Sequence, residues 1–198
     1  MARATLTAIV VTLALAGTAD AATRYAQEGG SDPGCTLAAP CDLPTAVESP
    51  TVADGDEIVL IGADPFVETG AVTIDDAITV RGAAGQVVQT SAANGFRVDD
   101  AGAVLRRIAV EHSGGSAAIR VEQGTVEAVA ARSQGAVACS LVPAVGGPAP
   151  LLRDGTCLSA TGASALSVMA AVPGSASARG RNVTAYAPAR GAGGPLVS

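Results

Sequence analysis

The sequence has no tryptophan and no lysine, and it holds only two phenylalanines, two tyrosines and one histidine in 198 residues. Hydrophobic residues still make up 48% of the chain, but most of them are alanine and valine. Because few large side chains are available to fill a globule, a core of this composition requires repetition and close approach of the backbone. The 24 glycines and 11 prolines exclude a helical bundle.

Charge is also scarce: charged residues are 15% of the chain, and the formal net charge is −6. An acidic protein of this kind disfavours nucleic acid and anionic membranes as partners. Every basic side chain apart from the one histidine is an arginine. Richness in Ala, Gly, Val and Arg without Lys is what GC-rich codons would give, and it favours a bacterial source.

The N-terminus, residues 1–21, has the parts of a secretory signal peptide. Arg3 is the positive region, residues 6–16 are the apolar region, and Ala19-Asp20-Ala21 fits a cleavage site. A membrane anchor is the alternative, but the apolar run is too short to span a bilayer. No second long apolar run follows. We therefore expect a secreted, extracellular protein with no membrane span in its mature chain.

Residues 22–54 are expected to hold a strand, a loop and a short helix. Tyr25-Ala26 predicts a first edge strand. Asp42 can cap a short helix that has Pro44 in its first turn, and Pro50 ends that helix.

The four cysteines are expected to form two disulfides, because an oxidising compartment favours pairing. Cys35 and Cys41 lie six residues apart, and Cys139 and Cys157 lie eighteen apart. Of the three possible connectivities, only Cys35–Cys41 with Cys139–Cys157 keeps both loops local. Metal ligation is the alternative for the first pair, but no second pair or histidine lies close to it in the sequence. Their spacing places Cys139 and Cys157 on neighbouring repeats.

Three short apolar runs rich in β-branched residues stand between Gly55 and Gly82, in GDEIVLIGADPFVETGAVTIDDAITVRG. Each is too short for a useful helix and is closed by turn residues, so each predicts a strand.

Beyond Gly82 the chain repeats itself with a drifting period. Phe96-Arg97-Val98-Asp99 recurs 23 residues later as Ile119-Arg120-Val121-Glu122. Residues 104–110 recur with an offset of 22, and residues 152–157 recur with an offset of 28. Coils joined by turns of variable length tolerate such drift, which favours a solenoid. Alternation predicts that Phe96, Val98, Ile119 and Val121 point inward and that Arg97 lies over Arg120 on the outer face.

The stretch from Gly55 to Gly82 also resembles a known family. The residues that carry the resemblance are Gly55, Asp56, Ile58, Leu60, Gly62, Phe66, Ile78, Val80 and Gly82. They look like the first coils of right-handed parallel β-helix proteins of the pectin-lyase-like superfamily. The fold class expected is therefore all-β: a right-handed parallel β-helix (solenoid) of five or six coils over residues 55–188. The resemblance also implies that residues 22–54, with the Cys35–Cys41 loop, form a short N-terminal cap before the coils. A Gly/Pro-rich tail, residues 189–198, follows the coils.

The ordinary signs of catalysis are weak. Ser113 follows His112 directly, and on a strand the two would point to opposite faces, so they do not form a triad. His112 is expected at a solvated turn. Asp75-Asp76 and Asp99-Asp100 precede turns, which explains both pairs, with Ca²⁺ binding as the alternative. One histidine and paired cysteines cannot supply a zinc site.

The superfamily offers a sharper comparison. Its polygalacturonases carry Asn-Thr-Asp and Gly-His-Gly motifs, and this chain has neither. Its pectate lyases carry Ca²⁺-binding aspartates with a catalytic Arg or Lys. Arg97 and Arg120, beside Asp99-Asp100, are the nearest equivalent, but we do not predict that they are catalytic. We predict no catalytic, metal-binding or cofactor-binding residue and no cofactor.

Two functions remain. The first is a secreted non-catalytic β-helix protein with a structural or surface/adhesive role, whose partner is an extracellular polysaccharide or a cell surface. The alternative is a polysaccharide lyase or glycoside hydrolase that acts on an acidic polysaccharide. The resemblance does not decide between them, because the superfamily includes lyases, hydrolases, esterases, tailspikes and proteins with no known activity.

Overall fold

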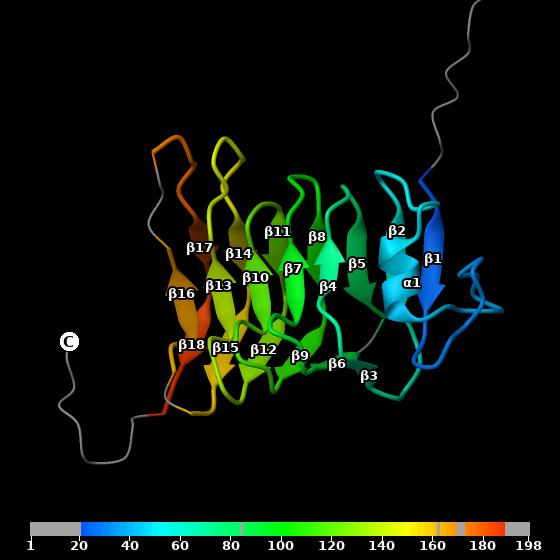
Figure 1. Ribbon diagram of the computed structural model, residues 1–198, viewed down its shortest axis with the longest axis horizontal. Helices are drawn as coiled ribbons and strands as arrows, with labels where there is room; N and C mark the ends of the chain where they lie inside the picture. The colour runs from blue at the N-terminus through cyan, green and yellow to red at the C-terminus, as the bar shows by residue number, and fades with distance from the viewer. Residues whose placement is uncertain (1–20, 84, 162, 170–172, 189–198) are drawn as a thin grey trace, which may run out of the picture.

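The computed structural model describes residues 21–83, 85–161, 163–169 and 173–188 and shows an elongated all-β solenoid of parallel strands (Figure 1). The expected signal peptide, except for its last residue, and the tail at 189–198 lie outside the described residues. No helix of the described chain is long and apolar enough to cross a membrane.

Three parallel sheets, A, B and C, run the length of the molecule. Sheet A contains β1 (Thr23–Ala26), β2 (Glu57–Leu60), β5 (Thr79–Gly82), β8 (Val104–Arg106), β11 (Thr125–Glu127), β14 (Leu151–Arg153) and β17 (Arg179–Arg181). Sheet B contains β3 (Phe66–Glu68), β6 (Val87–Thr90), β9 (Ala109–His112), β12 (Ala130–Ser133), β15 (Thr156–Ser159) and β18 (Thr184–Tyr186). Sheet C contains β4 (Val72–Ile74), β7 (Phe96–Val98), β10 (Ile119–Val121), β13 (Cys139–Leu141) and β16 (Leu166–Val168).

From β2 onward the chain visits sheets A, B and C in turn, and one passage through the three is a coil. The coils are β2–β4, β5–β7, β8–β10, β11–β13 and β14–β16, and β17 and β18 begin a further one. The predicted parallel solenoid of five or six coils is therefore confirmed.

The register confirms two of the three predicted offsets and corrects the third. Ile119 pairs with Phe96, and Leu152 pairs with Gly180, as offsets of 23 and 28 require. The offset of 22 for residues 104–110 is wrong, because Val126 pairs with Leu105, an offset of 21. A slip of one residue turns every side chain to the other face, so only the observed register keeps both of these apolar side chains in the core.

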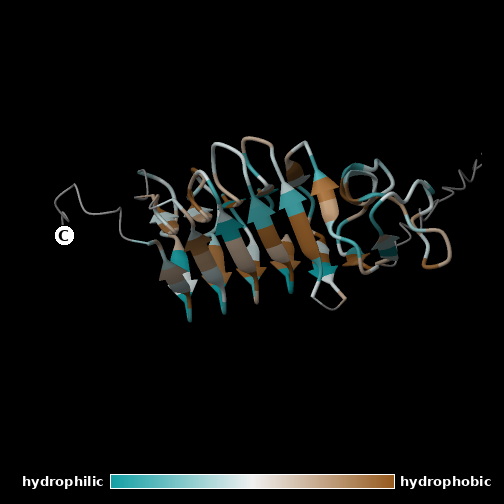
Figure 2. Ribbon diagram, turned by 90° about the horizontal axis from the view of Figure 1, so that it is seen from below, coloured by the Kyte–Doolittle hydropathy of each residue, from teal (hydrophilic) through white to brown (hydrophobic). Residues whose placement is uncertain are grey.

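The core is built from ladders of inward side chains that stack from coil to coil. Each ladder runs through one sheet; in sheet B, for example, Val88 stacks between Phe66 and Val110. All three are fully buried. Hydrophilic and hydrophobic segments recur in the same order along neighbouring strands, because every coil repeats one inward–outward alternation (Figure 2).

A short helix, α1 (Leu43–Glu48), packs against β1, β2 and β4. Its N-cap is Asp42, whose Oδ1 atom accepts a hydrogen bond of 2.8 Å from the backbone N–H of Thr45. Pro44 stands in the first turn, so the predicted capped helix is confirmed. β4 is the edge strand of sheet C, and the helix covers the apolar end of the solenoid there.

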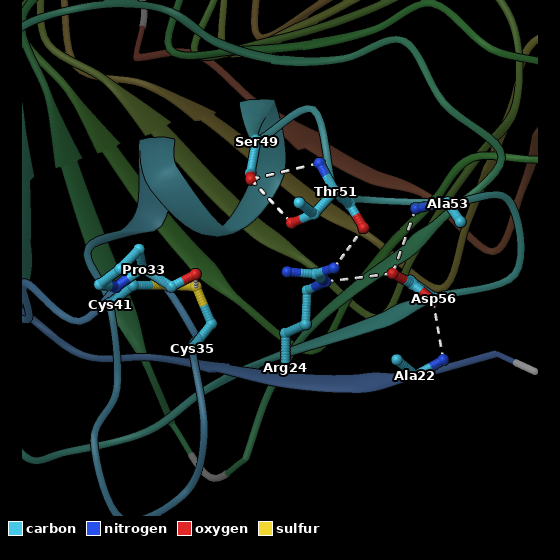
Figure 3. Close-up of polar contacts among 9 residues, drawn as sticks. All are labelled: Ala22, Arg24, Pro33, Cys35, Cys41, Ser49, Thr51, Ala53 and Asp56. Atoms are coloured by element: carbon cyan, nitrogen blue, oxygen red, sulfur yellow. Dashed lines mark hydrogen bonds and ion pairs between the residues drawn. A yellow bond between two sulfur atoms is a disulfide. The ribbon is translucent and has the colours of Figure 1, made fainter.

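Asp56 ties the first strand to the loop that follows α1 (Figure 3). Its carboxylate accepts hydrogen bonds from the backbone N–H groups of Ala22 at 2.7 Å and Ala53 at 3.2 Å, and it pairs with Arg24 at 3.1 Å. Burial favours the neutral acid, but these donors outweigh it and hold the pKa of Asp56 below its ordinary value. The buried carboxylate is thus ionised and fully paired.

Both disulfides connect the cysteines that were predicted to pair. Cys35–Cys41 closes a loop before α1, in the N-terminal segment. Cys139 and Cys157 are buried, and their Cα atoms lie 5.8 Å apart. Because Cys139 lies in β13 and Cys157 in β15, the second disulfide joins successive coils through the core.

Candidate binding surfaces

Arginines gather on the outer face of sheet A. Along one ladder, Arg81, Arg106, Glu127, Arg153 and Arg181 follow one another from β5 to β17. Arg179 lies on the neighbouring ladder of the same face, opposite Leu151. Since adjacent strands lie about 4.8 Å apart, the Cα atoms of Arg81 and Arg181 span roughly 19 Å. The face therefore carries a row of four arginines, interrupted by Glu127, that runs parallel to the solenoid axis.

Two glutamates on this face neutralise only part of the row. Glu57 accepts hydrogen bonds from Arg81 at 2.7 and 3.2 Å and from Arg106 at 3.0 Å. The hydrogen bonds from Arg81 are the main reason that the pKa of Glu57 is lowered. Glu127 pairs with Arg106 at 3.8 Å and with Arg153. Arg179 and Arg181 are exposed and form no ion pair with any described residue. Five arginines against two glutamates leave the outer face of sheet A cationic on an acidic protein.

The residues that most resemble a lyase site, Arg97 and Arg120, are held by ion pairs on the outer face of sheet C. Arg97 lies over Arg120, as predicted. Arg97 pairs with Asp99 at 2.7 Å and diagonally with Glu122 at 3.1 Å, and Arg120 pairs with Glu122 at 2.7 Å. Burial opposes ionisation of Glu122, but the two arginines lower its pKa. These side chains satisfy one another, as expected for a structural role.

The paired aspartates do not form a metal site in the described structure. Asp100 caps a turn, and its Oδ1 atom accepts from the N–H of Gly102 at 2.7 Å. Burial, together with the charges of Asp75, Asp54 and Asp100, raises the pKa of Asp76. Within the described ranges, no group of three histidine, cysteine or acidic residues could hold a metal ion.

A ladder of buried polar side chains runs through the inner face of sheet B. It consists of Glu68, Thr90, His112, Ser133 and Ser159, in successive coils. The prediction that His112 stands at a solvated turn is wrong, because it is the last residue of β9 and only 1% exposed. The strand alternates inward at Val110 and His112, so the imidazole enters the core.

His112 is only partly satisfied there. Its Nδ1 atom lies 2.8 Å from the hydroxyl oxygen of Thr90, and its Nε2 atom has no hydrogen-bond partner among the described residues. Burial lowers the pKa of the imidazole, so the ring is neutral at pH 7. A buried ring nitrogen without a partner lowers stability, because its hydrogen bond to water is lost on folding.

A hollow of about 260 Å³ lies at the carboxyl ends of β3, β6 and β9, and His112 is part of its lining. Glu68, Glu111, Gln89 and Gln134 are among its other lining residues. Glu68 lies on the inner face of sheet B, whereas Glu111 lies on the outer face. The amide of Gln89 donates to Glu111 at 3.4 Å. No arginine lines this hollow.

Glu68 has the most perturbed carboxyl group near this hollow. Burial, reinforced by the negative charges of Glu28, Asp42 and Glu48, raises its pKa to about 7. Glu68 is therefore close to half-ionised at neutral pH. Such a group can exchange protons or accept hydrogen bonds from a cation near physiological pH.

No family model, curated protein or solved structure matches this chain. The fold and the candidate sites therefore depend on the geometry described above.

Sequence reasoning singled out Arg97, Arg120 and the aspartate pairs but missed the arginine row and the hollow. A signal existed for both. Arg81 and Arg106 are 25 residues apart, within the range of the drifting period, and Glu68, Thr90 and His112 recur at intervals of 22. Following single positions from repeat to repeat would have placed these side chains in ladders.

Proposed function

We propose that the protein is a secreted, non-catalytic β-helix with a surface or adhesive role, and that it binds an acidic extracellular polysaccharide through the outer face of sheet A. The observation that carries this proposal is the excess of arginines on that face. Arg81, Arg106 and Arg153 share two glutamates, and Arg179 and Arg181 form no ion pair with any described residue.

The chemistry of the row suits a chain of carboxylates. Guanidinium groups bind carboxylates through two parallel hydrogen bonds, and they remain charged at every physiological pH. A row parallel to the solenoid axis matches a linear polymer better than a compact ligand. The protein's net charge of −6 repels polyanions elsewhere on its surface, so binding would be confined to this face.

Two features support the extracellular and non-catalytic parts of the proposal. The disulfides Cys35–Cys41 and Cys139–Cys157 are compatible with an oxidising compartment. Arg97 and Arg120, which most resemble the arginines of a lyase site, form ion pairs with Asp99 and Glu122. We also infer membership of the pectin-lyase-like superfamily from the resemblance of residues 55–82, with the parallel solenoid as its support.

The experiment measures retention of the intact protein on immobilised polygalacturonate and on a neutral glucan, at increasing salt. We expect retention on the acidic polymer only, weakening as salt screens the charges. The double variant Arg179→Glu and Arg181→Glu should reduce the affinity by about tenfold or more, since two attractive contacts become repulsive. The matched control reverses Arg132, an exposed arginine of β12 in sheet B.

The proposal is wrong if the sheet A variant and the Arg132→Glu control behave alike, or if a neutral glucan retains the protein equally well. Competition by double-stranded DNA at equal charge concentration would also contradict it, because the partner would then be any polyanion.

The second candidate function is a lyase or hydrolase of acidic polysaccharides, and one observation favours it. Glu68, whose pKa is raised to about 7, borders the same hollow as Glu111, although the two stand on opposite faces of sheet B. The test is release of reducing or unsaturated ends from uronate-containing and neutral polysaccharides, with and without Ca²⁺. Activity that disappears in Glu68→Gln would replace the non-catalytic proposal, and absence of product would leave that proposal in place.

A further inference from the structure

A second hollow, of about 380 Å³, lies at the amino ends of β8, β11, β14 and β17, where the chain passes from sheet C to sheet A. We call it the corner groove. Thr125, Leu151 and Arg179 line it and stack directly over one another in sheet A. Val126 and Leu152, the next residues along β11 and β14, are buried. Because successive side chains alternate across a strand, the three lining side chains share the outer face.

Two neighbouring segments supply most of the remaining lining. The β13–β14 loop contributes Pro148 and Ala149, and the segment that precedes β17 contributes Ala176. These segments lie side by side beyond the ends of the strands (Figure 1), and Val145 pairs with Ser175 in an antiparallel bridge between them. Backbone pairing therefore holds this part of the lining in place before a ligand arrives.

The corner groove combines one cation with an otherwise apolar surface. Arg179 is the only charged residue of the lining, and its side chain is exposed. Leu151, Pro148 and Ala149 are apolar, and the hydroxyl of Thr125 is the only other polar side-chain group. Such a surface suits a ligand that presents a carboxylate and, close to it, a small uncharged group that ends in a methyl.

The corner groove adjoins the arginine row of sheet A. Arg179 and Arg181 lie two residues apart on β17, so their Cα atoms are roughly 6.6 Å apart on the same face. Arg181 stacks on Arg153 of the row, and Arg179 stacks on Leu151 of the groove. A polymer whose carboxylates bind along the row therefore brings one of its sugar residues to the groove.

We propose that the acidic polysaccharide of the proposed function, on which this inference rests, is an O-acetylated polyuronate. The corner groove takes the acetyl group of one uronate residue, and the carboxylate of that residue pairs with Arg179. The methyl group packs on Leu151 and Pro148, and the hydroxyl of Thr125 donates to the ester carbonyl. A methyl ester does not meet these requirements, because esterification of the carboxylate removes the charge that Arg179 binds.

The test compares oligomers of polygalacturonate before and after chemical O-acetylation, which leaves their charge unchanged. Titration calorimetry of the intact protein should show that the acetylated oligomer binds about fourfold more tightly, as burial of one methyl group predicts. An O-acetylated neutral glucan should not bind, because it offers Arg179 no carboxylate. Equal affinity for the two uronate oligomers would overturn the acetyl assignment and leave the arginine row in place. Absence of binding to both would refute the row and this inference together.

A substitution of Leu151 tests the apolar side of the groove. Leu151→Ser should bind the two uronate oligomers equally, and its unchanged affinity for the unacetylated one shows that it is folded. The matched control is Val104→Ser, because Val104 is a partly exposed residue of the same ladder that does not line the groove. The control should keep the fourfold preference. A preference that is lost in both variants, or kept in both, would contradict the proposal.

A second pair of variants tests the cation. Arg179→Gln and Arg181→Gln each remove one guanidinium group, so each should weaken binding of the unacetylated oligomer by about threefold. Only Arg179→Gln should also lose the preference for the acetylated oligomer, because the carboxylate held by Arg179 places the acetyl group in the groove. The same preference in both variants would show that Arg179 does not position the acetylated sugar.

Discussion

At the scale of single residues, Glu68 couples folding to pH. Its ordinary pKa of 4.5 rises to about 7 in the folded protein. The folded state therefore binds a proton more tightly than the unfolded state does. The resulting stabilisation is fully present below pH 4.5 and is lost as pH rises through about 7.

Glu68→Gln should remove this dependence. At pH 8 the variant should be more stable than the wild type by about 1–3 kcal/mol, because the amide cannot ionise in the core. At pH 4.5 the two proteins should unfold at nearly the same temperature. Thermal denaturation at both pH values measures the difference, with Asp64→Asn as the control. A difference of equal size at both pH values would contradict the assigned cause.

Ala128 illustrates backbone strain at the corner between sheets A and B. Its φ is 50°, and Arg107, Asp154 and Asn182 take similar positive values at the equivalent place in neighbouring coils. An alanine side chain is strained in this left-handed region, whereas glycine adopts it freely.

Ala128→Gly should therefore stabilise the protein by about 0.5 kcal/mol, since relief of strain exceeds the added flexibility of the unfolded chain. The matched control is Ala130→Gly in β12, where the same substitution in a strand should destabilise by about 0.5–1 kcal/mol. Chemical denaturation gives both values. The same sign of change in the two variants would refute the argument.

At the scale of elements, each strand separates a stacked apolar face from a solvated face. In β10, Ile119 points inward between Phe96 and Cys139, while Arg120 points outward. A shift of one position along the strand moves a charged side chain from solvent into the core, because successive side chains alternate across the strand.

Ile119→Asp should destabilise the protein by about 4 kcal/mol or more, because an unpaired carboxylate enters a stacked apolar ladder. Ser140→Asp, on the outer face of the next strand of sheet C, should change stability by about 0.5 kcal/mol at most. Circular dichroism of both variants should show a lost or weakened β signal for Ile119→Asp alone. Native-like spectra and melting for Ile119→Asp would mean that the inner and outer faces are misassigned.

At the scale of the whole molecule, stability should vary along the axis, since each coil contacts only its neighbours. α1 covers the N-terminal end. The strands β17 and β18 at the other end are exposed along their whole length. The buried disulfide Cys139–Cys157 ties the fifth coil to the fourth and opposes fraying from that end.

Amide hydrogen exchange should therefore be slowest in β5–β12 and fastest in β16–β18. Replacing Cys139 and Cys157 by alanine should lower the global stability by roughly 3 kcal/mol in the chain-entropy model. It should also accelerate exchange in β14 and β15 far more than in β5. Uniform acceleration in every coil would show that the solenoid unfolds as a single cooperative unit.

The sequence alone determined the parallel solenoid, the capped helix at Asp42, and the local disulfide pairing. These features follow from short-range physics: alternation along strands, turn residues between them, capping, and the short loops that the disulfides close. The spacing of the repeats also predicted two of the three strand registers correctly, because stacked coils place equivalent residues over one another.

Only the tertiary structure decided which polar residues meet. Each coil contributes a single side chain to a ladder, and turns of different length separate those contributions in the sequence. The sequence therefore predicted that His112 is a turn residue, whereas the structure places it in β9 with its side chain in the core. For residues 104–110, the sequence predicted a register that is wrong by one position. The arginine row of sheet A and the hollow at the ends of β3, β6 and β9 exist because stacking brings residues from several coils together.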